Sequence, residues 1–68
     1  MRTLRQVIAT ISSYRRRRLN LLANARMAEK DGFLLVAKYL RERAKYYRER
    51  AKELELDADR IAAYEVSR

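Results

Sequence analysis

The stretch "EKDGF", residues 29–33, decides the fold because it contains Gly32, the only glycine of the chain. The chain has no proline, so Gly32 is the one strong break between two long segments with helical periodicity. A glycine just past the end of a helix adopts the left-handed conformation that closes the last turn, and Asp31 is a residue type that caps a following helix. The stretch therefore predicts a turn between two helices.

The helices are expected to occupy nearly the whole chain. The sequence "TLRQ", residues 3–6, has the spacing of a capping box, which marks a helix start. We predict a first helix over about residues 4–29, a turn at 30–32 and a second helix over about 33–64. The alternative is one helix that continues through the turn region, because an interior glycine costs a helix only about 1 kcal/mol. Disorder is disfavoured because the apolar residues are periodic.

Apolar residues recur with heptad spacing in both segments. The first seam reads Leu4, Val7, Ile11, Tyr14, Arg18, Leu21, Ala25 and Ala28, and the second reads Phe33, Ala37, Leu40, Ala44, Tyr47, Ala51, Leu54, Ala58 and Ile61. Folding the chain at residues 32–33 places small residues opposite large ones, as with Ala44 and Leu21. Regularly spaced alanine lets a neighbouring helix approach closely. The pattern predicts an all-α fold, an antiparallel two-helix hairpin.

A hairpin of 68 residues is short for a stable core of its own. The chain has no cysteine and no histidine, so disulfides cannot supply the missing stability and a typical zinc site is not expected. Apolar residues outside the seams widen the apolar stripe, chief among them Ile8, Leu22, Leu34 and Val36. We expect these residues to be buried between two copies that form a four-helix bundle. The alternative is that they are ordinary exposed apolar residues.

The stretch "NARMAEKDGFLLVAKYLRERAKYYRERAKEL", residues 24–54, resembles the helical hairpin of ferritin-like proteins of the rubrerythrin kind. The shared features are small residues before an acid-Gly-Phe turn and an alanine-spaced helix after it. The family's second helix carries a Glu-x-x-His pair for di-iron, and the matching positions here are Tyr47 and Arg50. The resemblance therefore implies a packing pattern and no metal. A dimer of hairpins is also similar in architecture, without matching residues, to the plasmid RNA-binding protein Rop.

The stretch "SSYRRRRLNLL", residues 12–22, interrupts the first seam with four consecutive arginines. Residues 1–28 contain seven arginines and no acid, whereas residues 29–68 contain ten basic and nine acidic residues, and the whole chain carries +8. Like charges at helical spacing destabilise a helix unless something compensates them. We expect Arg18 to lie in the seam against Tyr47 and the remaining charge to meet an anionic partner.

The predicted hairpin places residues 15–18 level with residues 47–50, which would give one basic belt around its middle. The candidate binding residues are Arg15, Arg16, Arg17, Arg43, Arg48, Arg50 and Tyr46. Arginine binds two phosphate oxygens at once, and tyrosine stacks on unpaired bases. Nucleic acid, either RNA or DNA, is therefore the expected partner. The alternatives are an acidic protein surface, as for an adaptor or inhibitor, and a purely structural subunit whose charged belt is solvated.

Residues typical of catalysis are scarce in this sequence. Histidine, cysteine and glycine-rich phosphate loops are absent, and most acids of the second segment have basic neighbours at helical spacing. We expect no enzymatic activity, no metal and no cofactor. No apolar run approaches the ~18 residues of a membrane span, and the lack of cysteine fits a reducing compartment. The expectation is a soluble cytoplasmic protein with no membrane partner.

Overall fold

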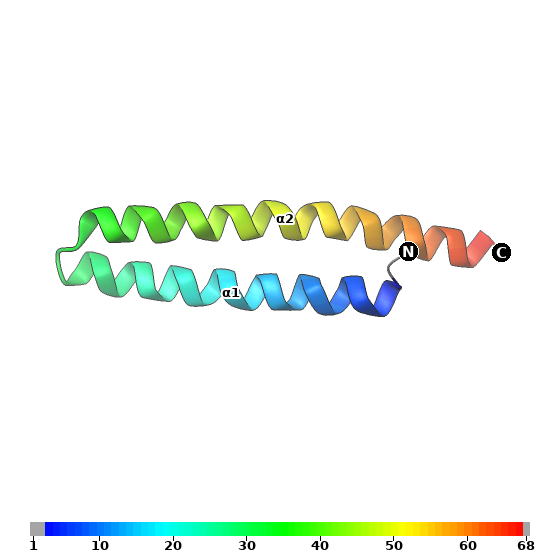
Figure 1. The fold of residues 1–68 in the computed structure, drawn as a ribbon, viewed down its shortest axis with the longest axis horizontal. Coiled ribbons are helices and arrows are strands. Elements are labelled where there is room, and N and C mark those ends of the chain that lie inside the picture. The colour runs from blue at the N-terminus through cyan, green and yellow to red at the C-terminus, as the bar shows by residue number, and fades with distance from the viewer. Residues whose placement is uncertain (1–2, 68) are drawn as a thin grey trace.

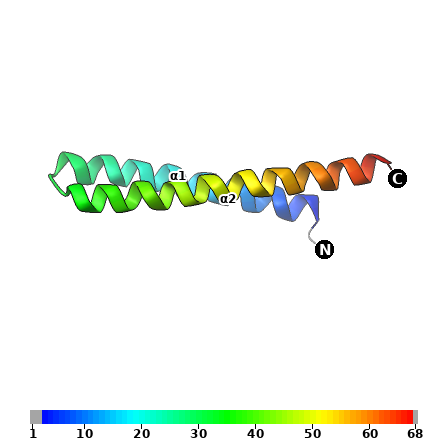
Figure 2. The same cartoon turned by 90° about the horizontal axis from the view of Figure 1, so that it is seen from above.

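The chain is an antiparallel hairpin of two helices in a computed structural model, which describes residues 3–67. Helix α1 spans Leu4–Lys30 and helix α2 spans Leu34–Ser67. The helices lie side by side in Figure 1 and cross at a shallow angle in Figure 2. They form a rod of 55 × 15 × 14 Å, and the longer α2 projects past the start of α1 (Figure 1). The all-α hairpin is confirmed, and the single continuous helix is excluded.

The predicted capping box starts α1. The Thr3 hydroxyl oxygen accepts a hydrogen bond of 3.2 Å from the Gln6 backbone N–H. The Thr3 backbone N–H donates in return to the Gln6 side-chain oxygen at 3.1 Å. Two N–H groups that the helix leaves unpaired are thereby satisfied, so the chain enters the helix at Leu4, as predicted.

Gly32 makes the turn with a backbone φ of +86°. Its N–H donates to the Glu29 carbonyl at 3.0 Å, and the Phe33 N–H donates to the Ala28 carbonyl at 2.8 Å. This pair of bonds is the Schellman arrangement, in which a left-handed residue closes a helix. The lone glycine of the sequence therefore stands where a positive φ is required.

Asp31 does not cap α2 as the sequence suggested. Its backbone N–H donates to the Met27 carbonyl at 3.0 Å, so Asp31 is the C-terminal cap of α1. The helix consequently runs to Lys30, and α2 starts at Leu34, each one residue later than predicted. Helix α2 also continues to Ser67, three residues past the expected end.

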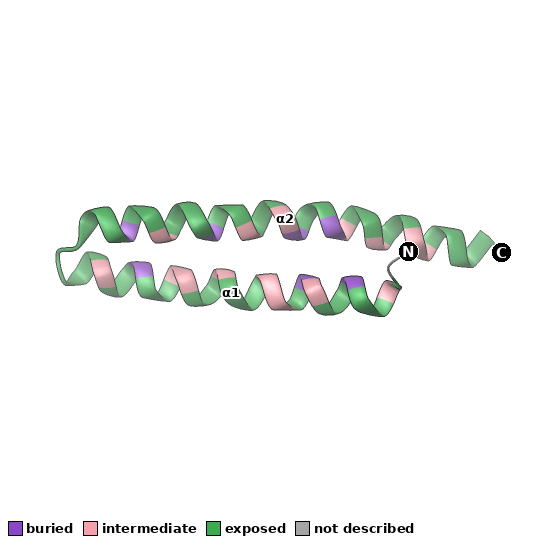
Figure 3. Ribbon diagram, viewed as in Figure 1, coloured by how far each residue is buried: buried purple, intermediate pink, exposed green. Residues whose placement is uncertain are grey.

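The core is the pair of predicted seams, which face each other along the rod (Figure 3). The buried residues are Val7, Ile11, Ala25, Ala37, Ala44, Ala51 and Leu54. Ile11 and Leu54 belong to one cluster, in agreement with their predicted pairing. Four of the seven are alanines of α1 and α2, which allows the helices to approach closely. Phe33 is not part of the seam: it precedes α2 and is 61% exposed.

Replacing Gly32 with alanine should lower the free energy of unfolding by about 1 kcal/mol. A Cβ atom at this position would meet no atom within 4 Å, so the cost is conformational and not steric. Gly32→Asn should cost less, because asparagine tolerates a left-handed backbone better than alanine does. Chemical denaturation of the three proteins measures both differences, and equal stability of all three would contradict the role given to this turn.

In the part of the chain that the structure describes, neither helix is both long enough and apolar enough to cross a bilayer.

Candidate functional site

Three tyrosines pack together at the middle of the hairpin. The Tyr14 and Tyr47 rings are tilted at 41° with centroids 5.5 Å apart, and Tyr46 meets Tyr47 edge-on at 5.4 Å. The Arg17 guanidinium lies 5.8 Å from the Tyr47 ring centroid, and that of Arg43 lies 5.4 and 5.5 Å from Tyr46 and Tyr47. We call these five residues the tyrosine cluster. Its arginines are held against aromatic faces by cation–π attraction.

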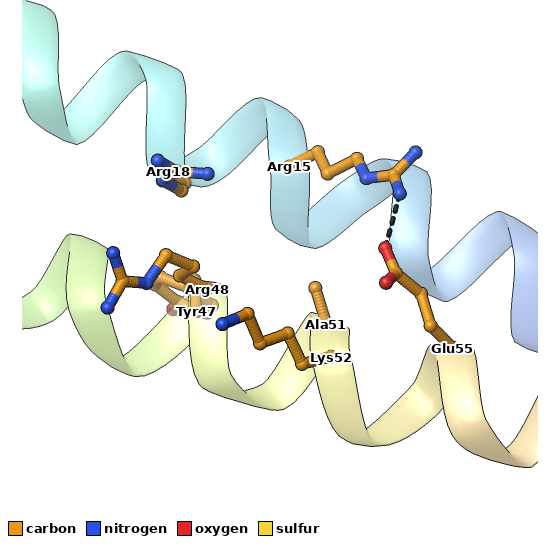
Figure 4. A pocket seen from close by; sticks show the side chains of 7 residues that line it. All are labelled: Arg15, Arg18, Tyr47, Arg48, Ala51, Lys52 and Glu55. Atoms are coloured by element: carbon orange, nitrogen blue, oxygen red, sulfur yellow. Dashed lines mark hydrogen bonds and ion pairs between the residues drawn. The ribbon is translucent and has the colours of Figure 1, made fainter.

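The arginines that contact Tyr47 differ from the arginine that the sequence predicted. Arg18 was expected to lie across Tyr47, but Arg17 and Arg43 hold that place. Tyr14 packs its own ring against Tyr47 from α1, one turn before Arg18. Arg18 is only partly buried and lies beside Arg48, on the side of the helix pair shown in Figure 4.

Two ion pairs join the helices, one on each side of the middle. Arg15 pairs with Glu55 toward the free ends of the hairpin, and Arg41 pairs with Glu29 toward the turn. The four side chains are between 43% and 61% exposed, so each pair contributes at most about 1 kcal/mol. The Arg15 pair corrects the expectation that the charge of Arg15 meets an anionic partner, because its long side chain reaches Glu55, beyond the level of residues 47–50.

A groove runs along one side of the hairpin between these two ion pairs. One of its hollows is lined by Arg15, Arg18, Tyr47, Arg48, Ala51, Lys52 and Glu55 (Figure 4). The next hollow is lined by Arg18, Leu22, Arg41, Ala44, Lys45 and Arg48. The two hollows share Arg18 and Arg48, and together they form what we call the cationic groove.

Four cations of the cationic groove have no acidic partner. They are Arg18, Lys45, Arg48 and Lys52, and within residues 3–67 none of them forms an ion pair or a side-chain hydrogen bond. The acids that line the groove or close its ends, Glu55 and Glu29, are already engaged by other arginines. The middle of the groove is therefore a stretch of uncompensated positive charge.

The predicted belt is divided between two sides of the hairpin. Arg15 and Arg48 line the cationic groove, whereas Arg17 lines a hollow with Tyr47, Asn20 and Asn24 on another side. Successive helical residues are about 100° apart, so side chains one and two positions apart cannot share a face. The predicted belt therefore consists of two surfaces with different chemistry. One is the cationic groove, and in the other the arginines pack against tyrosine rings.

The remaining residues of the predicted belt do not line the cationic groove. Arg16 is exposed and does not line the groove, because its position on α1 is about 100° from Arg15 and about 160° from Arg18. Arg50 forms a 2.7 Å ion pair with Glu53. Tyr46, 48% exposed, belongs to the tyrosine cluster beside Arg43.

Sequence reasoning missed Lys45 and Lys52, although a signal for both was present. Helix α2 contains three related heptads, "AKYLRER" at 37–43, "AKYYRER" at 44–50 and "AKELELD" at 51–57. Each begins with a buried alanine followed by an exposed lysine, so every lysine flanks the helix contact. The third heptad replaces the cations after its lysine with acids, which ends the basic stripe at Lys52.

The predicted dimer residues are not gathered in one patch. Leu34 and Val36 line an apolar hollow around the turn with Phe33 and Leu35. Leu22, by contrast, lies in the cationic groove, and Ile8, 51% exposed, is near the opposite end of the rod. An interface over the groove would bring the cations of two copies together, whereas the turn surface is apolar.

Residues 3–67 contain no cluster of three or more acidic, histidine or cysteine side chains that could hold a metal ion. Comparison with known proteins finds no matching family model, no similar curated protein and no similar solved structure.

Proposed function

We propose that this chain is a small non-enzymatic protein that self-associates and binds nucleic acid through the cations at the middle of its hairpin. The observation that carries the proposal is the set of four groove cations without an acidic partner. Phosphate is the anion that such a set suits, because arginine and lysine neutralise successive phosphates along a strand and release their counterions. The absence of cysteine fits action in a reducing compartment such as the cytoplasm.

The distribution of acids supports a binding site over a merely solvated surface. A surface that serves solubility intersperses both signs of charge. Ion pairs between the helices mix both signs of charge at the two ends of the groove, and residues 53–67 of α2 carry five acids and one base. In the middle of the groove four cations lie side by side without an ion pair in residues 3–67, at a cost that a bound anion would remove.

The tyrosine cluster supports a role beside the groove. Tyr46 is about half exposed and is braced by Tyr47 and Arg43. An exposed aromatic ring on a rigid support can stack on an unpaired base. Arg17 adds positive charge within this cluster and remains part of the proposed binding region, whereas the charge of Arg50 is already engaged by Glu53.

Self-association is proposed because the hairpin buries little. Among the larger side chains of residues 3–67 only Val7, Ile11 and Leu54 are buried, and twelve large apolar side chains are exposed. Four of them are consecutive, Phe33 through Val36, with exposures of 50–83%. Charge also favours this end, because the middle of a second copy would be repelled by the same cations. The second copy therefore belongs at the turn surface, residues 33–36, in a symmetric contact.

Binding of the wild-type protein to a labelled 20-nucleotide strand should fall steeply with salt. Four phosphate contacts on a single strand give a slope of log K against log salt of about −3. Fluorescence anisotropy between ~50 and ~300 mM salt measures this slope. A shallow slope, together with equal or tighter binding to poly-glutamate, would instead favour an acidic protein as partner and an adaptor or inhibitor role.

A further inference from the structure

We infer that the cationic groove holds the sugar-phosphate backbone of a single nucleic-acid strand, with Arg18, Lys45, Arg48 and Lys52 each contacting a phosphate. This inference rests on the proposed function and locates it on one side of the hairpin. Two of the four residues, Lys45 and Lys52, lie outside the belt that the sequence suggested, and two belt residues, Arg16 and Arg50, are excluded from the contact.

The spacing of the cations fits a single strand with stacked bases. Arg41, Lys45, Arg48 and Lys52 follow one another at intervals of four, three and four residues, which keeps them on one stripe of α2. At 1.5 Å per residue the stripe is about 16 Å long. A strand with stacked bases, which rises about 3.4 Å per nucleotide as in a duplex, would pass about five phosphates over it. Arg18 extends the contact to α1 from across the groove.

The shape of the groove leaves its cations available. Ala44 and Ala51 line it and are 2% and 6% exposed, so small side chains of α2 lie beside the cations at these two positions. The ion pairs of Arg15 and Arg41 mark its two ends. Between these ends none of the described residues that line the groove is acidic. A bound anion would supply the negative charge there.

Nearby acids of α2 do not neutralise the lysines. Glu42 lies three residues before Lys45, and Glu49 lies between Lys45 and Lys52 at helical spacing from both. Neither acid forms an ion pair with a lysine in the part of the chain that the structure describes. Both lysines therefore remain free to meet a phosphate, and binding does not first have to break an internal pair.

The double variant Lys45→Gln/Lys52→Gln tests the inference. Both residues are exposed, so the variant should keep its helix content and its thermal midpoint within a few degrees. Removing two phosphate contacts should reduce the salt slope for a single strand by about 1.4. Binding should be about 70-fold weaker at ~50 mM salt, because a slope change of about 1.4 acts over the twentyfold range between ~50 mM and ~1 M.

The matched control is Arg5→Gln/Lys30→Gln, which removes the same charge from the two ends of α1. Both control residues are exposed and lie outside the groove. The control should leave the salt slope unchanged. If the wild-type protein binds and both double variants lose the same affinity for the strand, the groove is not the binding site. The proposed function would still stand in that case. Failure of the wild-type protein to bind any strand at ~50 mM salt would overturn the proposed function itself.

Discussion

Leu54→Ala should lower the free energy of unfolding by about 3 kcal/mol. Leu54 is 3% exposed and forms the centre of the main cluster with Val7 and Ile11. Its truncation removes buried methyl groups and leaves a cavity between two helices that have few other large contacts. A domain of this size has only about 3–5 kcal/mol of stability, so much of the variant should be unfolded at 25 °C. Circular dichroism at 222 nm during urea titration measures the loss.

Leu56→Ala is the matched control for Leu54→Ala. Leu56 is the same residue type two positions along α2 and is 58% exposed. Its truncation should cost less than about 0.5 kcal/mol, as at ordinary surface positions. Equal losses for the two variants would mean that the cluster around Leu54 does not hold the hairpin together.

The double variant Leu34→Lys/Val36→Lys should abolish the proposed dimer. The wild-type protein should have a mass of about 16 kDa in solution, twice the 8.1 kDa of one chain. Two lysines at the turn surface of each copy place four charges against one another and remove the apolar contact. The variant should therefore have a mass of about 8 kDa by light scattering, the value for one chain.

The control for the dimer prediction is Leu56→Lys, at an exposed leucine of the third heptad away from the turn. This variant should remain dimeric. A mass of about 16 kDa for the Leu34→Lys/Val36→Lys variant would place the contact elsewhere on the hairpin, and a monomeric wild-type protein would contradict self-association altogether.

The fold was largely predictable because its determinants are local or periodic. The single glycine marks the turn, the Thr3 box marks a helix start, and the heptads identify the buried positions. The errors arose where one backbone bond or one side chain decides the outcome. The assignment of Asp31 depended on which helix its N–H group joins, and that of Phe33 depended on a shift of one residue at the helix start.

The candidate site was less predictable because long side chains choose among several neighbours. Heptad positions placed Arg15 and Arg18 near α2, yet they could not show that Arg15 reaches Glu55 or that Arg17 takes the face of Tyr47. A run of four arginines drew attention to α1. The lysines that complete the groove stand singly in α2 and are recognisable only by their repeated position after a buried alanine.

Amide chemical shifts recorded with and without a single-stranded oligonucleotide show which residues of the hairpin contact nucleic acid. Shifts should concentrate at the cationic groove, with Lys45, Arg48 and Lys52 on α2 and Arg18 on α1, and they should vanish at high salt. The turn surface at residues 33–36 should be unaffected. Shifts confined to the turn surface, or no shifts at ~50 mM salt, would contradict the claim that this groove binds nucleic acid.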